Sequence, residues 1–564
     1  MKWATPDVLV IGGGAAAAVA ALEASKNADV MMISKDRVLG GASIQAGGGI
    51  SVPGVAPDDQ DPDLFINDTV KAGEGINNLE LVKLLANSGK VFFEYLEELG
   101  VFFDKEEGSY RMKKRTEGHS VARSYQDRRM FHEIGRVLRA NLAHSNVDLW
   151  QHAMVFALCT DENSVIGAIA FHIPTGELIY IVPRSVVIAT GGFGQLYRVS
   201  DNAITLNGEG ASLALECGAE LMDMEMVQFI PLSFPYPESM LGVFIGMCSL
   251  FGPKVKLYNG LGERFMERYD PQNLEFSTRD KVARAIFQEL ISGRGTQRGT
   301  IIFDPTENDR SLLQQYYEST PTVYSMLARV FGEKAALWEA PFEAVPAQHF
   351  CCGGIRIDVE CRTSCKNLFA VGEVSAGLHG ANRLGGNALL EVIIMGKIAG
   401  ASASKGAFTN KGSSKVDNKL KDFFKKEKAE IEALLHKENQ GKEFNPYQIK
   451  RKLQQVMWEH CGIVRNDRSL QEGLKKLTAL STNVKQISLI NVGKAWNYAL
   501  LEALEVKHML RVAEAVLKSA AFRKESRGAH YNEDYPQTNP LFKGNTIVSM
   551  DHDGNLNVKF HALD

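Results

Sequence analysis

The N-terminal pattern of apolar and polar residues predicts a strand, a helix and a second strand. Residues 7–11 (DVLVI) are short, apolar and β-branched, which is typical of a buried parallel strand. Three glycines follow, and residues 15–24 are a run of strong helix formers. Residues 29–33 have the pattern of another buried strand. We therefore expect a βαβ unit with a glycine turn between its first strand and its helix.

The glycine turn has the spacing of a dinucleotide-binding fingerprint. Gly12 suits the tight turn, and Gly14 allows the backbone to approach a pyrophosphate at the helix N-terminus. Ala17 takes the third glycine position. The acidic residue usual after the second strand is replaced by Ser34 and Lys35, so we expect ribose recognition through a hydroxyl group and the backbone.

Two more glycine clusters extend this picture. Residues 40–50 (GGASIQAGGGI) are too rich in glycine for a packed element. They form either a flexible loop or a backbone that approaches a large flat ligand such as an isoalloxazine. Residues 185–194 (SVVIATGGFG) predict a buried strand that runs into a glycine turn. Together the three segments predict an FAD-binding domain interrupted by insertions.

Composition excludes several other classes of protein. The chain has 564 residues, a formal charge of −4 from 63 basic and 67 acidic residues, and only 8 cysteines. This balance argues against nucleic-acid binding, and the cysteines are too sparse for a disulfide framework. No stretch reaches the ~18 apolar residues that span a bilayer, and residues 8–22 lack a basic leader and a cleavage site. We expect a cytoplasmic protein that meets a membrane only through partners.

Four segments resemble the flavoproteins of succinate dehydrogenase, fumarate reductase and L-aspartate oxidase, in the same order along the chain. They are residues 262–285, 366–397 (KNLFAVGEVSAGLHGANRLGGNALLEVIIMGK), 457–480 and 525–536 (ESRGAHYNEDYP). The resemblance implies an α/β fold with a Rossmann-like FAD-binding domain, an inserted α+β capping domain and a C-terminal helical domain. The expected bounds are 1–235 and 341–410 for the FAD-binding domain, 236–340 for the capping domain, 411–530 for the helical domain and 531–564 for a tail.

The resemblance also assigns site residues. Arg383 matches the arginine that holds a substrate carboxylate, and its guanidinium suits bidentate binding of an oxyanion. His349 matches a substrate-binding histidine. A structural ion pair and a satisfied core histidine are the respective alternatives. The residues expected to bind the cofactor are Gly12, Gly13, Gly14, Ala15, Ser34, Lys35, Gly41, Ala42, Ser43, Gly48, Gly49, Ala189, Thr190, Gly191, Glu209, Glu373, Asn387 and Leu389.

Three departures from the family pattern change the expected chemistry. Ala42 occupies the place of the histidine that carries covalent flavin, so FAD should bind non-covalently. A histidine and a threonine of the family's substrate motif are replaced by Ile230 and Leu232. The proton-donating arginine is expected near Phe251, where no arginine stands. These changes predict a site that accepts an anionic substrate with a less charged body than fumarate, lined by Ile230, Leu232 and Phe251.

The favoured function is hydride transfer between flavin N5 and an anionic enoate other than fumarate. The chain has no iron–sulfur or zinc motif, so we expect electrons to be exchanged with an iron–sulfur partner protein. One alternative is a flavoprotein that only relays electrons, and another is thiol/disulfide or sulfur-oxyanion chemistry on the same scaffold. A third is a true fumarate reductase, succinate dehydrogenase or L-aspartate oxidase in which Lys254, Lys256 or Arg264 supplies the proton.

Overall fold

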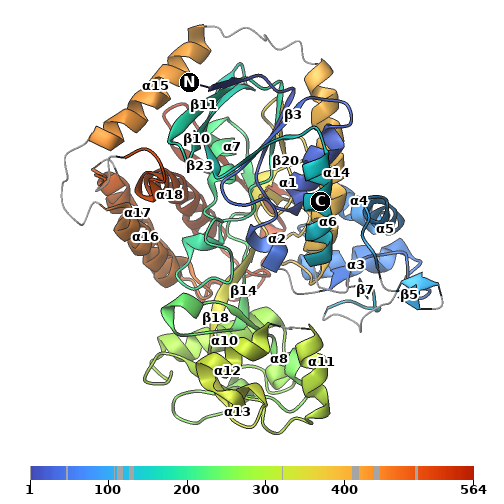
Figure 1. The fold of residues 1–564 in the computed structure, drawn as a ribbon. Coiled ribbons are helices and arrows are strands. Elements are labelled where there is room, and N and C mark those ends of the chain that lie inside the picture. The colour runs from blue at the N-terminus through green and yellow to red at the C-terminus, as the bar shows by residue number, and fades with distance from the viewer. Residues whose placement is uncertain are drawn as a thin grey trace.

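The computed structural model describes most of the chain (Figure 1). The described residues are 2–45, 49–103, 105–106, 108–110, 118–125, 132–319, 322–409, 418–436, 445–484, 486–489 and 493–563. None of the helices within these ranges is long and apolar enough to cross a membrane. The expected α/β fold, with a Rossmann-like FAD-binding part, is confirmed.

A five-stranded parallel sheet forms the centre of the FAD-binding part. Its order is β20 (Leu368–Ala370), β12 (Ser185–Ile188), β2 (Val8–Ile11), β3 (Val30–Ser34) and β8 (Asp148–Gln151). The four residues of β2 and of β12 are all buried, because helices and a second sheet cover both faces of a parallel sheet. The first three predicted elements appear as β2, α1 (Ala15–Ala24) and β3.

Two helices, α1 and α14 (Asn387–Thr409), pack closely beside this sheet. Helix α1 is almost entirely alanine, and α14 presents Gly396 and Gly400 to it. A Cβ at Gly400 would overlap the carbonyl oxygen of Ala20, so only glycine permits this approach. The pairing brings residues far apart in sequence to the glycine turn that follows β2.

A four-stranded sheet lies on the N-terminal side and is covered by a helix. Its order is β1 (Lys2–Ala4), β11 (Glu177–Ile181), β10 (Ser164–His172) and β9 (Ala153–Asp161). Helix α15 (Asn418–His436) contacts β9 and β10, and Phe424 packs against the rings of Trp3 and Tyr180. Phe424 and other apolar residues of α15 are therefore buried against this sheet.

The capping part has its own sheet and its own core, seen at the bottom of Figure 1. The sheet order is β15 (Phe244–Gly246), β14 (Val227–Ser233), β18 (Phe342–Cys351), β17 (Ile301–Asp304) and β16 (Lys256–Tyr258). Strands β14 and β18 extend from the FAD-binding core into the capping core. The helices here are α8 (Cys248–Phe251), α9 (Met266–Tyr269), α10 (Arg279–Ile291), α11 (Ser311–Ser319), α12 (Val323–Phe331) and α13 (Glu333–Ala336).

The C-terminal third packs against the FAD-binding part. Helices α16 (Pro446–Cys461), α17 (Asp467–Val484) and α18 (Tyr498–Phe522) pack on one another. The hairpin of β22 (Gly544–Met550) and β23 (Leu556–Ala562) joins β13 (Leu221–Met222), β19 (Gly354–Arg356) and β21 (Ser375–Ala376) in one sheet. Strands β22 and β23 near the C-terminus therefore share a sheet with strands from residues 221–376.

Smaller elements complete the described chain. They are α2 (Gly41–Gln45), α3 (Pro62–Ala72), α4 (Leu79–Ala86), α5 (Gly89–Glu98), α6 (His132–His144), α7 (Glu209–Glu216), β4 (Ile50–Ser51), β5 (Lys105–Glu106), β6 (Ser109–Tyr110), β7 (Ser124–Tyr125), η1 (Gly194–Leu196), η2 (Glu238–Met240), η3 (Leu274–Phe276) and η5 (Pro540–Phe542).

Candidate active site

The glycine turn after β2 is built from close backbone approaches. Gly12 has φ of 137°, and a Cβ there would overlap the carbonyl oxygen of Ala189. A Cβ at Gly13 would overlap the hydroxyl of Ser34, which is buried. Gly12 therefore accepts only glycine, and a side chain at Gly13 would displace the Ser34 hydroxyl. The backbone at Gly13 and Gly14 keeps partial solvent exposure within an otherwise buried region, so it remains open to a ligand.

The N-terminus of α1 begins at this turn. Gly14 is its N-cap and supplies no side-chain hydrogen bond, whereas the backbone N–H of Ala15 donates to the Ser43 hydroxyl at 3.1 Å. Helix N-termini favour anions such as a pyrophosphate. Ala42 and Ser43 lie in α2, so residues 41–45 form a short helix, although the glycine content of residues 40–50 predicted no packed element there. Gly48 lies outside the described residues.

The next glycine in this cluster sits against β7. A Cβ at Gly49 would overlap the hydroxyl of Ser124, which explains why glycine is needed at this point. Gly41, in contrast, has φ of 66° and open space where a Cβ would lie.

A charged network lies where β3 ends. The Lys35 ammonium forms ion pairs with Glu209 at the start of α7 and with Glu505 of α18, the latter at 2.6 Å. Burial alone would lower the pKa of Lys35, but the two carboxylates raise it above its usual value. Lys35 and Glu209, which the sequence assigns to the cofactor, are therefore held in one network with Glu505 from the helical part.

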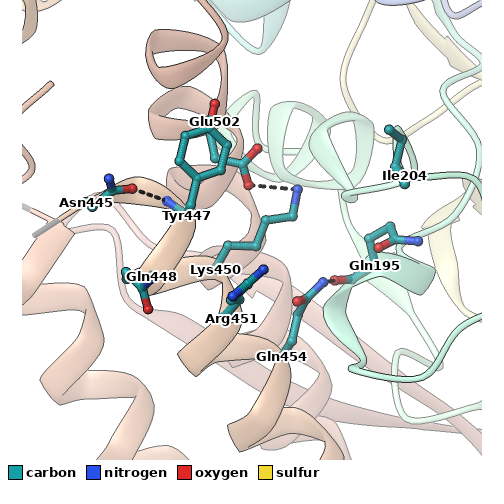
Figure 2. Close-up of a pocket in the computed structure, with 9 residues that line it drawn as sticks. All are labelled: Gln195, Ile204, Asn445, Tyr447, Gln448, Lys450, Arg451, Gln454 and Glu502. Carbon is teal, nitrogen blue, oxygen red and sulfur yellow. Dashed lines mark hydrogen bonds and ion pairs between the residues drawn. The ribbon is translucent and has the colours of Figure 1, made fainter. Parts of the chain in front are cut away.

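A cavity of about 480 Å³ adjoins this network, because Lys450, which lines the cavity, also pairs with Glu505. Figure 2 shows the residues that line it. Lys450 lies in it and pairs with Glu502 at 2.8 Å and with Glu505 at 3.4 Å. The remaining lining residues are Gln195, Ile204, Asn445, Tyr447, Gln448, Arg451 and Gln454. None of the residues expected to bind substrate lines this cavity, which lies between α16, α18 and η1.

Glu373 lies beneath the glycine turn after β12. Its carboxylate accepts a hydrogen bond from the Cys351 backbone N–H at 3.1 Å, and a Cβ at Gly192 would crowd it at 2.6 Å. Burial raises the pKa of Glu373 to about 7, against the lowering effect of that hydrogen bond. Thr190 and Gly191, beside it, are half-buried.

Helix α14 begins at Asn387, whose side-chain amide donates to the Thr69 hydroxyl at 3.1 Å. The oxygen of that amide and the Thr190 hydroxyl are both buried without hydrogen-bond partners among the described residues. Buried polar atoms normally have partners. These two unpaired atoms, together with the glycine turn after β2 and the half-buried Leu389, therefore fit a bound cofactor. Such a cofactor would provide the missing hydrogen-bond partners.

Arg383 lies just before α14 and is surrounded by fixed groups. Its Nη2 is 2.9 Å from His349 Nε2 and 3.4 Å from Gln228 Oε1, and the guanidinium lies 4.4 Å above the Phe350 ring. Burial lowers the pKa of Arg383 to about 10, so the group still carries its charge at neutral pH. Its Nε is buried without a partner among the described residues.

The other predicted catalytic residue, His349, is held by Asp201. The distance from His349 Nδ1 to the Asp201 carboxylate is 2.6 Å. Burial lowers the pKa of His349, Asp201 opposes that effect, and the charges of Arg383 and Arg279 add to it. No signal in the sequence marks Asp201, because a single aspartate in a loop carries no motif.

Arg279, at the first position of α10, is the arginine that sequence reasoning missed. Its Nη1 is 3.4 Å from Gln228 Oε1, and its Nε donates to the Met247 sulfur at 3.2 Å. The Gln228 amide nitrogen donates to Asn382 and to the Arg383 carbonyl oxygen, which turns its oxygen toward both guanidinium groups. The capping part thus delivers an arginine to the site from residue 279, not from near residue 251.

Two residues expected to line the substrate site lie elsewhere. Phe251 is fully buried in the capping core against Phe303, Tyr316 and Trp338, and Leu232 belongs to the same core. Phe251 was misplaced by counting along the sequence through a region of different local structure, whereas Leu232 was placed by its position in the family's substrate motif.

Ile230 is buried in a small apolar cluster against which Phe244 packs. The Phe244 ring lies 6.5 Å from the His349 ring, so Phe244 provides an apolar wall that the sequence did not reveal.

Two of the three alternative proton donors form ion pairs elsewhere in the capping part. Lys256 pairs with Glu307, and Arg264 pairs with Glu275 at 2.6 Å and donates to it through two nitrogens. Within the described residues, no group of three or more histidine, cysteine or acidic side chains could hold a metal ion. All eight cysteines are reduced and buried.

Known proteins of the same architecture cover the whole chain. Residues 7–389 match the family model of the FAD binding domain, and residues 450–564 match that of the fumarate reductase flavoprotein C-term. One component of the fumarate reductase (CoM/CoB) from Methanothermobacter marburgensis is 35% identical over 96% of this chain and 97% of its own. L-aspartate oxidase 2 of Ralstonia nicotianae is 32% identical over 94% and 91%.

Solved structures agree with these matches. A variant of FrdA, from the quinol fumarate reductase of Escherichia coli, superposes with a TM-score of 0.90 at 28% identity and covers 100% of this chain and 97% of its own. Adenylylsulfate reductase of Archaeoglobus fulgidus has the same fold, with a TM-score of 0.77 at 19% identity. With FAD as its cofactor, the chain belongs to the FAD-dependent oxidoreductases of the fumarate reductase, succinate dehydrogenase and L-aspartate oxidase flavoprotein family.

Proposed function

We propose that the protein transfers hydride to or from the carbon–carbon bond next to a substrate carboxylate. The observation that carries the proposal is the convergence of Arg383 and Arg279 on the one oxygen of Gln228, beside His349. The two guanidinium groups come from different parts of the molecule, and together they place two positive charges beside a single amide oxygen. Such a pair suits an anionic ligand.

Each residue has a distinct part in this proposal. Arg383 holds the carboxylate, and His349 orients it. Arg279 neutralises charge that develops on the substrate and is the donor best placed to return a proton to the carbon next to the carboxylate. When bound, FAD would supply or accept the hydride. Preorganised charges of this kind stabilise a transition state without reorganisation.

The apolar wall formed by Phe244, which packs on the cluster that buries Ile230, sets the preferred substrate class. The wall lies on the His349 side of the site, so a second carboxylate there would lose water without gaining a partner. We therefore propose a monocarboxylic enoate as the preferred substrate class.

Fumarate is the second candidate. The relatives named above include fumarate reductases, and Arg279 is a second cation that could pair with a second carboxylate. In that case each arginine would bind one of the two substrate carboxylates.

Thiol chemistry on this chain's own cysteines is not favoured, because Cys351 and Cys352 are buried. Burial raises the pKa of Cys351 far above its usual value and that of Cys352 to about 12, so both thiols stay protonated at neutral pH. The thiolate is the reactive form of cysteine.

Two further parts of the proposal concern the cofactor and the partner. Ala42 has no nucleophile, so FAD should be released when the protein is precipitated with acid, and flavin that stays with the pellet would contradict this. Relatives are described as subunits of fumarate reductases. This supports an iron–sulfur partner that exchanges electrons with the flavin, and full turnover of the isolated chain with NADH or NADPH alone would contradict it.

The deciding experiment compares crotonate with fumarate, using a reduced viologen dye as electron donor. We expect kcat/KM to be at least tenfold higher for crotonate, because burial of an unpaired charge costs several kcal/mol. A higher value for fumarate would establish the second candidate. Activity with neither, although the partner reduces the flavin, would indicate a protein that only relays electrons.

A further inference from the structure

The loop that carries Asp201 is fixed to the strand that carries His349. The backbone N–H of Asp201 donates to the Gln348 carbonyl oxygen at 3.0 Å, and the Asn202 amide donates to the His349 carbonyl oxygen at 2.8 Å. The Ser200 hydroxyl donates to the Gln348 side chain at 2.8 Å. Asp201 therefore has a defined position relative to the imidazole of His349.

The two ring nitrogens of His349 meet groups of opposite character. Nδ1 faces the Asp201 carboxylate at 2.6 Å, and the side chain of Asp201 is only 8% exposed. Nε2 faces Arg383 Nη2 at 2.9 Å. A carboxylate can only accept a hydrogen bond and a guanidinium can only donate one. Both contacts are satisfied when the neutral ring carries its proton on Nδ1 and leaves Nε2 as an acceptor.

We propose that Asp201 is a positioning residue that selects this tautomer of His349 and thereby fixes the Arg383 guanidinium for the substrate carboxylate. The inference rests on the proposed role of Arg383. It adds a residue that makes no direct contact with the substrate and acts through a chain of two hydrogen bonds.

The geometry explains why the tautomer matters. With its proton on Nε2, the ring would direct a donor at the guanidinium, and Arg383 would lose one of the two acceptors that hold Nη2. The remaining contact, to Gln228, is longer at 3.4 Å. An unfixed arginine loses conformational entropy on binding the substrate, which weakens binding more than it slows the chemical step.

The first test reads the tautomer directly and does not depend on the substrate. In FAD-loaded protein labelled with 15N-histidine, His349 is assigned by its loss in His349→Gln. We expect the wild-type resonances at neutral pH to show a protonated Nδ1 and an unprotonated Nε2. In Asp201→Ala the proton should shift toward Nε2. The same tautomer in both proteins, or Nε2–H in the wild type, would overturn the proposal.

Titration of His349 gives a second readout in the same samples. The charged groups that face the ring are Asp201, Arg383 and Arg279. Asp201 raises the pKa of His349 and the arginines lower it, so Asp201→Ala should move the titration midpoint to lower pH. An unchanged midpoint would show that Asp201 does not act on the ring.

The kinetic test separates binding from chemistry. With crotonate and fumarate as probes, Asp201→Ala should raise KM roughly 10- to 100-fold, as expected when a charged hydrogen bond is lost, with a smaller change in kcat. Asp201→Asn retains an oxygen that can accept from Nδ1 and should recover part of the loss. Asn202→Ala removes a contact to the His349 backbone from the same loop and should leave the tautomer unchanged.

The outcomes keep the two proposals apart. If the wild type acts on neither probe, the proposed function fails and the tautomer experiment still decides the role of Asp201. If the probes are turned over but Asp201→Ala folds normally with wild-type KM and tautomer, only the positioning role fails.

Discussion

The two ends of the site are built in opposite ways. At the nucleotide end, the backbone does the recognition: Gly12 and Gly13 are adjacent, and a Cβ at either would collide with a neighbouring segment of the chain. At the substrate end, side chains do it, and Asp201, Arg279 and Arg383 come from three separate parts of the chain. A backbone site appears in sequence as a local motif, whereas a side-chain site exists only after folding.

The largest effect is expected at the backbone site. Gly12→Val should abolish FAD binding, because the side chain would overlap the Ala189 carbonyl oxygen and valine disfavours φ of 137°. The flavin-to-protein ratio of purified protein measures this. Gly135→Ala is the matched control, since α6 leaves open space at that position. Stoichiometric flavin in Gly12→Val would show that this turn is more tolerant than its geometry indicates.

The next effect tests the side-chain site. Arg279→Gln should lower kcat/KM by about 10²–10⁴ through loss of the proton donor, and should leave flavin content unchanged. The surface variant Arg310→Gln, whose side chain is 66% exposed, controls for loss of charge. A change of less than threefold would remove Arg279 from the catalytic role that we propose.

A smaller effect concerns the apolar wall. Phe244→Ala should raise KM for longer monocarboxylic enoates roughly tenfold, because part of an apolar contact is lost, and should change KM for fumarate much less. Steady-state kinetics with enoates of increasing chain length measures this. Equal changes for both substrates would mean that Phe244 supports the site without selecting its ligand.

The smallest effect is a pH dependence of stability. The pKa of Glu373 in the folded protein is raised to about 7 from 4.5, so the folded state holds a proton that the unfolded state releases between these values. This destabilises the folded state increasingly as pH rises from about 4.5 to 7. Glu373→Gln in flavin-free protein should therefore raise Tm relative to wild type above pH 7, by about 1–3 °C, and by less at pH 5. A pH-independent difference would contradict this assignment.

The sequence predicts local features of the fold better than it predicts which side chains meet at the site. Helix α1 appears at the predicted residues, since local propensity and burial favour the same structure there. Arg383 could be found because it lies in the recognised segment 366–397, and His349 because it matches a substrate-binding histidine of the family. Asp201 could not, because its role depends on a loop pairing with β18, and Phe251 was misplaced because spacing from a motif does not report which core a side chain joins.

The way in which β14 and β18 join two cores has a consequence for synthesis of the chain. The capping core consists of residues between Leu232 and Ala344, whereas the nucleotide-binding core needs strands and helices from Val8 to Leu556. Closing such long loops is entropically costly and slow, and contiguous segments form first. Capping residues can therefore collapse while the ribosome is still making α14. The nascent protein cannot complete its flavin site until the helix beginning at Asn387 has emerged and docked against α1.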